Sequence, residues 1–402
     1  MKTSKLLLSS MLFIALISAC STEQENKKVE FIKIDTIEKN KKSENLNIHL
    51  SPIDTFYNNL TQLLGGKDTV FSFSNNWDTE FIKKYARKVN EKYKKIETNR
   101  LKKMGDWNQK NLKRNNQSDT SFVFYPFSGG DFIHLSWMFP NATQYLMVAQ
   151  EDVGNIPDLY NQDSKFVNKY LSEIDTVLRD IYYKSYFITK NMIEDTKVRS
   201  KVNGMLPLII WALARTEHEI VSIKFGNVNP NGVIEFAAGI DQKNKPKAVE
   251  IMFRKKNTVI TKTLTYVSCN ISDQGFNSES KFYTYLNNKI PKNCNSFVKS
   301  ASYLLHYITF KQIRDLIKNK SQFLVQDDTG IPFSNLIQDK CWKIELFGKY
   351  EKPVKDFSEN LFQSDLDSAF KNESYFKGKI DFSLGYHWGS QNQNQMVLRK
   401  IN

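Results

Sequence analysis

Residues 326–332, QDDTGIP, contain a tripeptide that matches a catalytic signature. Asp328-Thr329-Gly330 has the sequence of an aspartic-peptidase loop, and such enzymes need two of these loops so that two carboxylates share one proton. The chain contains no second Asp-Thr-Gly or Asp-Ser-Gly. We therefore interpret the segment as a turn in which Asp327 and Asp328 accept hydrogen bonds from backbone N–H groups and Gly330 has a positive φ.

Two other loops combine aromatic rings with groups that form hydrogen bonds. Residues 125–132, YPFSGGDF, contain Ser128 and Asp131, and residues 385–389, GYHWG, contain Tyr386, His387 and Trp388. Loops held by a rigid scaffold often carry binding residues. One interpretation is that these two loops and residues 326–332 form an amphipathic pocket for a sugar, a peptide or an amine. The other, which we favour on the sequence alone, is that all three are structural turns filled by aromatic side chains.

The carboxylates of these loops also support a second hypothesis, a cell-envelope hydrolase. Asp131, Asp327 or Asp328 would act as acid and base, with His387 nearby. Such chemistry needs two carboxylates about 5–10 Å apart in a cleft. No complete catalytic set accompanies them, because the chain has no GxSxG, no P-loop and no HExxH motif. An enzyme is therefore the less favoured interpretation.

The sequence predicts neither a metal nor a cofactor. No two of the five histidines have the spacing of a metal-binding pair, and each alone is typical of a structural histidine. These residues are His49, His134, His218, His306 and His387.

Residues 1–19 have the order of a secretory leader. Lys2 and Lys5 precede an apolar run that is too short for a stable membrane span, and small residues follow it up to Cys20. This arrangement resembles a bacterial lipobox, which implies that Cys20 is acylated and anchors the chain. The alternative is a plain secretory leader with an incidental cysteine. We predict an outer-membrane lipoprotein on the periplasmic side or at the cell surface, with residues 20–50 as a flexible tether.

Three cysteines remain after Cys20, namely Cys269, Cys294 and Cys341. An exported compartment permits a disulfide, and three cysteines allow one bridge. A bridge between Cys269 and Cys294 closes the shortest loop and is the first expectation, with three buried free thiols as the alternative.

The chain carries a formal net charge of +14, and much of it lies in one predicted helix. Residues 78–104 place Ile82, Tyr85 and Val89 on one apolar stripe. Between Phe81 and Arg114 there are 13 Lys and Arg residues against three acidic residues. This surface is either the solvated side of an amphipathic helix or a surface for anionic lipid, lipopolysaccharide phosphates or an acidic envelope protein. Nucleic acid is not expected as a partner.

Hydrophobic residues make up 40% of the chain and charged residues 25%, which excludes a disordered or multi-span membrane protein. Runs with strand periodicity alternate with helical patterns, and no Pro-rich linker follows residue 50. We predict one α+β domain over residues 51–402, with a mixed, mainly antiparallel sheet and packed helices. Within it, we expect a helix over residues 299–317 and a hairpin that pairs residues 380–384 with 396–399.

A set of motifs in fixed order is similar to a family of uncharacterised bacterial exported lipoproteins. The motifs are YPFSGGDF, FPNATQY, EDVGNIPDL, KSASYLLHY, QDDTGIPF, ELFGKYEKPVKDF and FSLGYHWGSQNQN, and the resemblance runs from about residue 78 to the C-terminus. Gly130 and Asp152 occupy positions at which we would expect proline. The resemblance implies location and domain extent, but no activity. We predict a lipid-anchored binding or assembly protein of the cell envelope.

Overall fold

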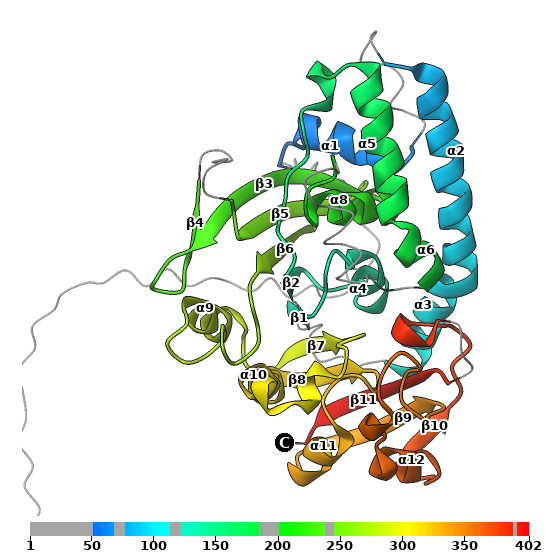
Figure 1. Ribbon diagram of the computed structural model, residues 1–402, viewed down its shortest axis with the longest axis vertical. Coiled ribbons are helices and arrows are strands. Elements are labelled where there is room, and N and C mark those ends of the chain that lie inside the picture. Colours follow the sequence, from blue (N-terminus) through cyan, green and yellow to red (C-terminus); the bar gives the residue numbers. More distant parts are fainter. Residues whose placement is uncertain are drawn as a thin grey trace, which may run out of the picture. The chain divides into compact units, whose positions relative to one another are not determined.

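The computed structural model describes most of the chain after residue 50 (Figure 1). All described residues lie in one compact unit, His49–Asn402. The predicted leader, the tether and Cys20 lie outside the described residues. No helix in the described part of the chain is long and apolar enough to cross a membrane. The described residues are 51–67, 77–112, 122–184, 186, 201–237, 245–388 and 392–401.

In the described residues, eleven strands form one mixed sheet in the order β10-β9-β11-β8-β7-β1-β2-β6-β5-β3-β4. The prediction of one α+β domain with a mixed sheet and packed helices is confirmed. Antiparallel pairing joins the long strands β3, β5 and β6 on one side and β8, β11 and β9 on the other. The strands are β1 Phe122–Pro126, β2 Gln144–Ala149, β3 His218–Val228, β4 Ile234–Phe236, β5 Ala248–Lys255, β6 Thr261–Ser268, β7 Cys294–Val298, β8 Ser321–Gln326, β9 Trp342–Gly348, β10 Phe376–Gly378 and β11 Asn394–Lys400.

The centre of the sheet consists of five neighbouring parallel strands, β8-β7-β1-β2-β6. From β1 the chain continues to β2 on one side, whereas from β7 it continues to β8 on the other side. The boundary between β1 and β7 is therefore a topological switch point. In open sheets with parallel strands, ligands bind beyond the carboxyl ends of the strands at such a point.

Two hydrophobic layers cover the two faces of the sheet, and alternate residues of each strand enter different layers. In β1, Val123 and Tyr125 belong to one cluster, while Phe122 and Phe124 belong to the other. The first layer contains α1 Thr55–Leu64, α2 Thr79–Ile96, α3 Lys102–Asn111, α4 Phe132–Met138, α5 Ser164–Val177, α6 Arg179–Lys184 and α8 Leu206–Arg215. The second contains α9 Lys281–Lys289, α10 Lys311–Lys320, α11 Phe333–Gln338 and α12 Ser364–Phe370.

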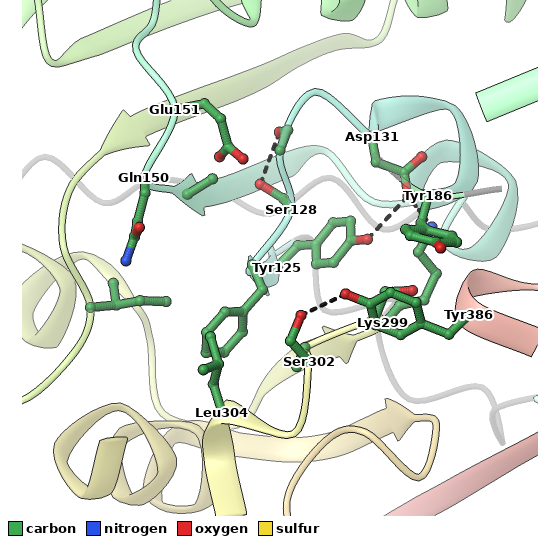
Figure 2. A pocket seen from close by; sticks show the side chains of 16 residues that line it. Tyr125, Ser128, Asp131, Gln150, Glu151, Tyr186, Lys299, Ser302, Leu304 and Tyr386 are labelled. Atoms are coloured by element: carbon green, nitrogen blue, oxygen red, sulfur yellow. Dashed lines mark hydrogen bonds and ion pairs between the residues drawn. The ribbon is translucent and has the colours of Figure 1, made fainter. Parts of the chain in front are cut away.

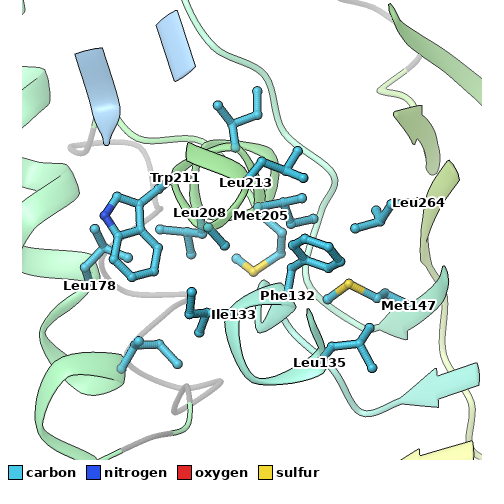
Figure 3. Packing of buried hydrophobic residues seen from close by; sticks show 14 of the residues in the cluster. Phe132, Ile133, Leu135, Met147, Leu178, Met205, Leu208, Trp211, Leu213 and Leu264 are labelled. Carbon is cyan, nitrogen blue, oxygen red and sulfur yellow. The ribbon is translucent and has the colours of Figure 1, made fainter. Parts of the chain in front are cut away.

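Helix α8 is the most deeply buried helix of the first layer, and every residue in it is buried. Its sequence, LPLIIWALAR, is apolar on all sides, and Pro207 lies in the first turn, where its missing N–H costs nothing. Figure 3 shows Leu208 and Met205 facing Phe132 and Ile133 of α4. A Cβ at Gly130 would lie 3.0 Å from Leu208 Cβ, so a small residue before α4 permits this close packing.

Helix α2 continues through a π-helical turn, Glu97–Leu101, into α3. Ile82, Tyr85 and Val89 are buried on its inner side, as the periodicity predicted. Asp78 caps the amino end by accepting a hydrogen bond from the Phe81 N–H at 3.0 Å. The sequence predicted a basic amphipathic helix here, and its basic residues, where the structure describes them, lie on one.

Two secondary-structure predictions were wrong. Residues 299–317 do not form one helix, because β7 ends at Val298, an irregular segment follows and α10 begins only at Lys311. Residues 380–384 form no hairpin with 396–399, because β11 lies between β8 and β9 and pairs with both. The Ser300 and Ala301 N–H groups bond the side chains of Asp327 and Thr329, and β11 pairs with two distant strands. Local periodicity does not report such distant partners.

The expected disulfide is not formed. Cys269, Cys294 and Cys341 are free thiols, and the first two are buried. Cys294 lies in β7, and Cys269 follows β6, so two central strands, β1 and β2, separate these strands in the sheet. The alternative of free thiols therefore holds, although the Cys341 side chain is only partly buried.

Candidate functional site

A cavity of about 310 Å³ lies beyond the carboxyl ends of β1, β2 and β7. Its walls come from the segments that follow these strands and from Tyr186 and Tyr386 (Figure 2). Side chains with hydroxyl or charged groups line one part, including Ser128, Asp131 and Lys299. Apolar side chains line the rest, namely Phe127, Ala149, Ile271, Ala301 and Leu304. The cavity thus lies at the switch point that the topology defines.

The three predicted loops meet at this place, but only part of the predicted set lines the cavity. Ser128, Asp131 and Tyr386 do so. The other residues of the set are arranged differently: Asp327, Asp328 and His387 are buried outside the cavity lining, and the Trp388 side chain is 44% exposed and does not line the cavity.

Asp131 is the centre of the first buried polar network. Its Oδ1 lies 2.7 Å from His134 Nδ1, its Oδ2 accepts a hydrogen bond from Tyr125 Oη at 3.1 Å, and Lys299 Nζ forms an ion pair with the same oxygen. Asp131 also caps α4 by accepting a hydrogen bond from the His134 N–H. Burial alone would raise the pKa of Asp131, but His134 and the Lys299 ammonium outweigh it and hold the pKa at about 2. Asp131 is therefore a carboxylate at neutral pH.

His134 and Lys299 are also fully buried. Burial lowers the pKa of His134 to about 4, so its imidazole is neutral and donates its Nδ1–H to Asp131. Burial also lowers the pKa of Lys299, which the attraction of Asp131 opposes. The result is one buried ion pair at the wall of the cavity, with a neutral histidine behind it.

Asp328 is the centre of a second network behind the first. Its Oδ1 accepts hydrogen bonds from His387 Nε2 at 2.6 Å and from Asn394 Nδ2 at 3.0 Å, and its Oδ2 accepts one from Tyr303 Oη at 2.5 Å. Burial would raise the pKa of Asp328, but His387 reverses the shift and lowers it. The pKa of His387 is raised by Asp328 against the effect of burial. Each partner thus favours the charged form of the other.

The segment after β7 has an unusual backbone, and Asp327 holds it in place. Ser300, Ser302 and Tyr303 all have positive φ values between 54° and 56°, which is rare for residues other than glycine. Asp327 Oδ2 accepts a hydrogen bond from the Ser300 N–H at 3.0 Å, and Thr329 Oγ1 accepts one from the Ala301 N–H at 2.9 Å. Burial and the nearby Asp328 raise the pKa of Asp327. The DDTG segment therefore positions the cavity wall, although Gly330 does not have the predicted positive φ.

Thr329 offers a test of this positioning. Its hydroxyl accepts from Ala301 N–H and donates to Asp327 Oδ1, so Thr329→Val leaves the Ala301 N–H without this partner and Asp327 Oδ1 with one hydrogen bond fewer. We expect the free energy of unfolding to fall by about 1–3 kcal/mol. Urea denaturation measures it, with Thr176→Val as the matched control, because Thr176 is exposed and its hydroxyl bonds only Ser172 O. Equal effects of the two substitutions would contradict the assignment.

The 385 loop closes the cavity next to this segment. Gly385 has a φ of +63°, and a Cβ there would lie 2.4 Å from Ser300 Oγ and 3.2 Å from Asp327 Oδ2. Tyr386 follows it, and its hydroxyl forms a 2.5 Å hydrogen bond with Ser302 Oγ. Its ring lies 4.4 Å from the Tyr186 ring, centroid to centroid. Glycine is required here because any side chain would collide with the cavity wall.

Sequence reasoning missed several residues of the cavity, above all Lys299. It assigned Lys299 to a predicted helix, whereas the residue directly follows β7 and its side chain reaches Asp131. Ser300, Ser302 and Tyr186 were also missed, because no local sequence feature connects them to the three loops. One signal was present: KSASYLLHY is among the motifs that carry the family resemblance, and its first four residues all line the cavity.

The described residues hold no group of three or more His, Cys, Asp and Glu side chains arranged for a metal ion. Comparisons with family models, curated proteins and solved structures find no match for this chain. The resemblance to exported lipoproteins stays a prediction.

Proposed function

We propose that this chain is a lipid-anchored binding protein of the cell envelope, and that its cavity holds a small amphipathic ligand. The observation that carries this proposal is the cavity itself, which lies at the switch point of the parallel strands and has a polar and an apolar part. A volume of about 310 Å³ matches the lower end of ligand-binding pockets. The lipobox at Cys20 supports the location.

The lining favours a ligand with a ring or apolar body and several hydroxyl, amide or amine groups. Tyr186 and Tyr386 supply ring faces, which stack on sugars and other flat groups. Burial raises the pKa of Tyr386 to about 12, so its hydroxyl remains a donor at any physiological pH. Ser300 Oγ is buried at the cavity wall and has no hydrogen-bond partner among the described residues. A ligand polar group would satisfy it.

The hydrolase alternative has weaker support from the geometry. Asp131 lines the cavity, but its oxygens accept hydrogen bonds from Tyr125, His134 and Lys299, and its pKa of about 2 makes it a poor acid and a poor base at neutral pH. Asp327 and Asp328 are fully buried and serve the backbone and His387. We therefore favour binding over hydrolysis.

A thermal-shift screen with monosaccharides, peptidoglycan fragments and amino acids tests the proposal. A ligand at 100 times its Kd stabilises the protein by about 2.7 kcal/mol, which raises Tm by about 3–4 °C at this size. Tyr386→Phe removes one hydroxyl from the cavity and is expected to weaken the affinity about 2- to 10-fold. The matched control is Tyr183→Phe, because the Tyr183 side chain is 60% exposed.

Two outcomes would contradict a ligand in this cavity. The first is a hit whose affinity Tyr386→Phe and Ser128→Ala both leave unchanged. The second is the absence of any hit, combined with a substrate turnover that Asp131→Asn abolishes, which would favour the hydrolase.

A further inference from the structure

The outer side of the helix from Thr79 to Asn111 is a strongly basic surface. At 1.5 Å per residue this helix is about 50 Å long. Its inner side is buried against α4, α5, α6 and α8, so only one side faces solvent. We call the exposed cations of that side the basic face, and they are Lys83, Lys84, Arg87, Lys88, Lys94, Lys95, Lys102, Lys103 and Lys110.

Carboxylates of the same protein neutralise little of the basic face. Three exposed acidic residues accompany the nine cations, namely Glu80, Glu91 and Asp106. Arg87 lies 3.5 Å from Glu80, and Lys88 forms a 2.7 Å ion pair with Asp175. Within the described residues, no carboxylate lies within 4 Å of the other cations of the basic face.

Part of this charge pattern opposes the stability of the helix. Lys83 and Arg87, and likewise Lys84 and Lys88, are like charges four residues apart, and such pairs destabilise a helix. An ordinary solvated helix surface mixes both signs. The basic face therefore has a charge pattern that folding alone does not explain.

The composition of the basic face indicates the class of partner. No large hydrophobic side chain between residues 77 and 112 is exposed, so the face lacks the aromatic and aliphatic anchors that dominate protein–protein interfaces. None of its residues lines the cavity. A long row of exposed cationic groups without a pocket suits a surface of many phosphates, which each cation attracts independently.

We infer that the basic face docks the protein on an anionic lipid surface through headgroup phosphates. The attraction is electrostatic, without insertion of side chains into the acyl region. It would orient the body against a bilayer, independently of any acyl anchor and of any ligand in the cavity.

Vesicle co-sedimentation tests this inference with the full chain carrying Cys20→Ala, which cannot be acylated at that position. The probes are vesicles of phosphatidylglycerol and phosphatidylcholine, and vesicles of phosphatidylcholine alone. We expect binding to the anionic vesicles at 50 mM salt and a steep loss at 300 mM, because the Debye length shortens with salt.

Two variants with equal charge change separate the basic face from the net charge. The first replaces four cations of the face by glutamine, Lys83, Lys84, Lys94 and Lys95. The second replaces four exposed lysines elsewhere, Lys256, Lys292, Lys352 and Lys355. We expect the first to lower the partition coefficient at least tenfold and the second to lower it less than threefold. Unchanged urea midpoints show that both remain folded.

Three results would overturn the inference. These are equal losses for both variants, equal binding to both kinds of vesicle, and no binding to anionic vesicles. A polyglutamate matrix serves as a probe for acidic proteins. If the chain binds this matrix and does not bind the vesicles, the basic face is a protein-docking surface and the inference is wrong.

Discussion

Replacing Lys299 by methionine lowers the free energy of unfolding by about 3–5 kcal/mol, because it leaves the carboxylate of Asp131 buried without its counter-ion. Both side chains are 2% exposed, so water cannot compensate the charge. The pKa of Asp131, held at about 2 in the folded protein, rises when the ammonium is removed. Urea denaturation at pH 7 measures the loss.

Two further variants make this expectation specific. Asp131→Asn combined with Lys299→Met removes both charges and keeps a side-chain oxygen for the Tyr125 hydroxyl, so the pair of substitutions costs less than Lys299→Met alone. Lys311→Met breaks an exposed pair with Asp315 at 2.6 Å and costs less than about 0.5 kcal/mol. If Lys299→Met costs no more than Lys311→Met, the buried pair is not formed in solution.

Stability falls by several kcal/mol between pH 6.5 and pH 4, because buried neutral histidines must take up protons on unfolding. Burial lowers the pKa of His134 to about 4 and that of His218 to about 3, against about 6.5 in the unfolded chain. Below pH 6.5 the unfolded state therefore binds more protons, and stability decreases as the pH falls towards the folded pKa values. His306, whose pKa burial lowers to about 4, adds a smaller effect because it is partly exposed.

The contribution of His387 to stability changes with pH in the opposite direction. Its pKa is raised by Asp328, so its stabilisation is complete below about pH 6.5 and is lost as the pH rises through its folded pKa. Together with the other histidines, it places the maximum of stability near pH 6.5. Urea midpoints at half-unit steps from pH 4 to 8.5 measure this profile.

The substitution His218→Phe isolates the contribution of one histidine to the loss of stability below pH 6.5. His218 lies among aromatic rings, 5.0 Å from Phe253 and 6.5 Å from Phe132 between centroids, so a phenyl ring fits its site. The variant has no group at position 218 that takes up a proton. Its free energy of unfolding therefore falls less between pH 6.5 and 4.5 than that of the unchanged chain, by about 2–3 kcal/mol. His387→Phe is the control, because it reduces the loss of stability at high pH instead of the loss at low pH. Identical acid slopes in the His218→Phe variant and the unchanged chain would contradict a neutral His218.

The two buried networks give the DDTG segment a physical role without peptidase chemistry. Asp327 and Thr329 hold the strained backbone after β7, and Asp328 joins His387 of the 385 loop to Tyr303. Several hydrogen bonds thus hold Ser300, Ser302 and Tyr303 in a backbone conformation that is unfavourable for serine and tyrosine. Such strain is frequently found in binding and active sites, which agrees with its place at the cavity.

Local sequence features determined several of the elements and the identity of the three loops. The stripe of Ile82, Tyr85 and Val89 predicted α2, because a helix places residues three and four apart on one side. Polar and aromatic residues between apolar runs identified residues 125–132, 326–332 and 385–389 as loops of one kind. These patterns depend only on neighbours in the chain, so the sequence reports them.

The tertiary structure alone decided which strands are neighbours, and with it the site. Lys299 and Asp131 are 168 residues apart and meet only because β7 pairs with β1 in parallel. β7 ends at Val298, so the first part of the predicted helix over residues 299–317 is a strained segment, and only residues 311–317 lie in a helix, α10. Strand order depends on burial and hydrogen bonding summed over the whole sheet, and no local pattern contains that sum. For this reason the sequence identified the loops, but neither the ion pair between Asp131 and Lys299 nor the residues after β7 that line the cavity.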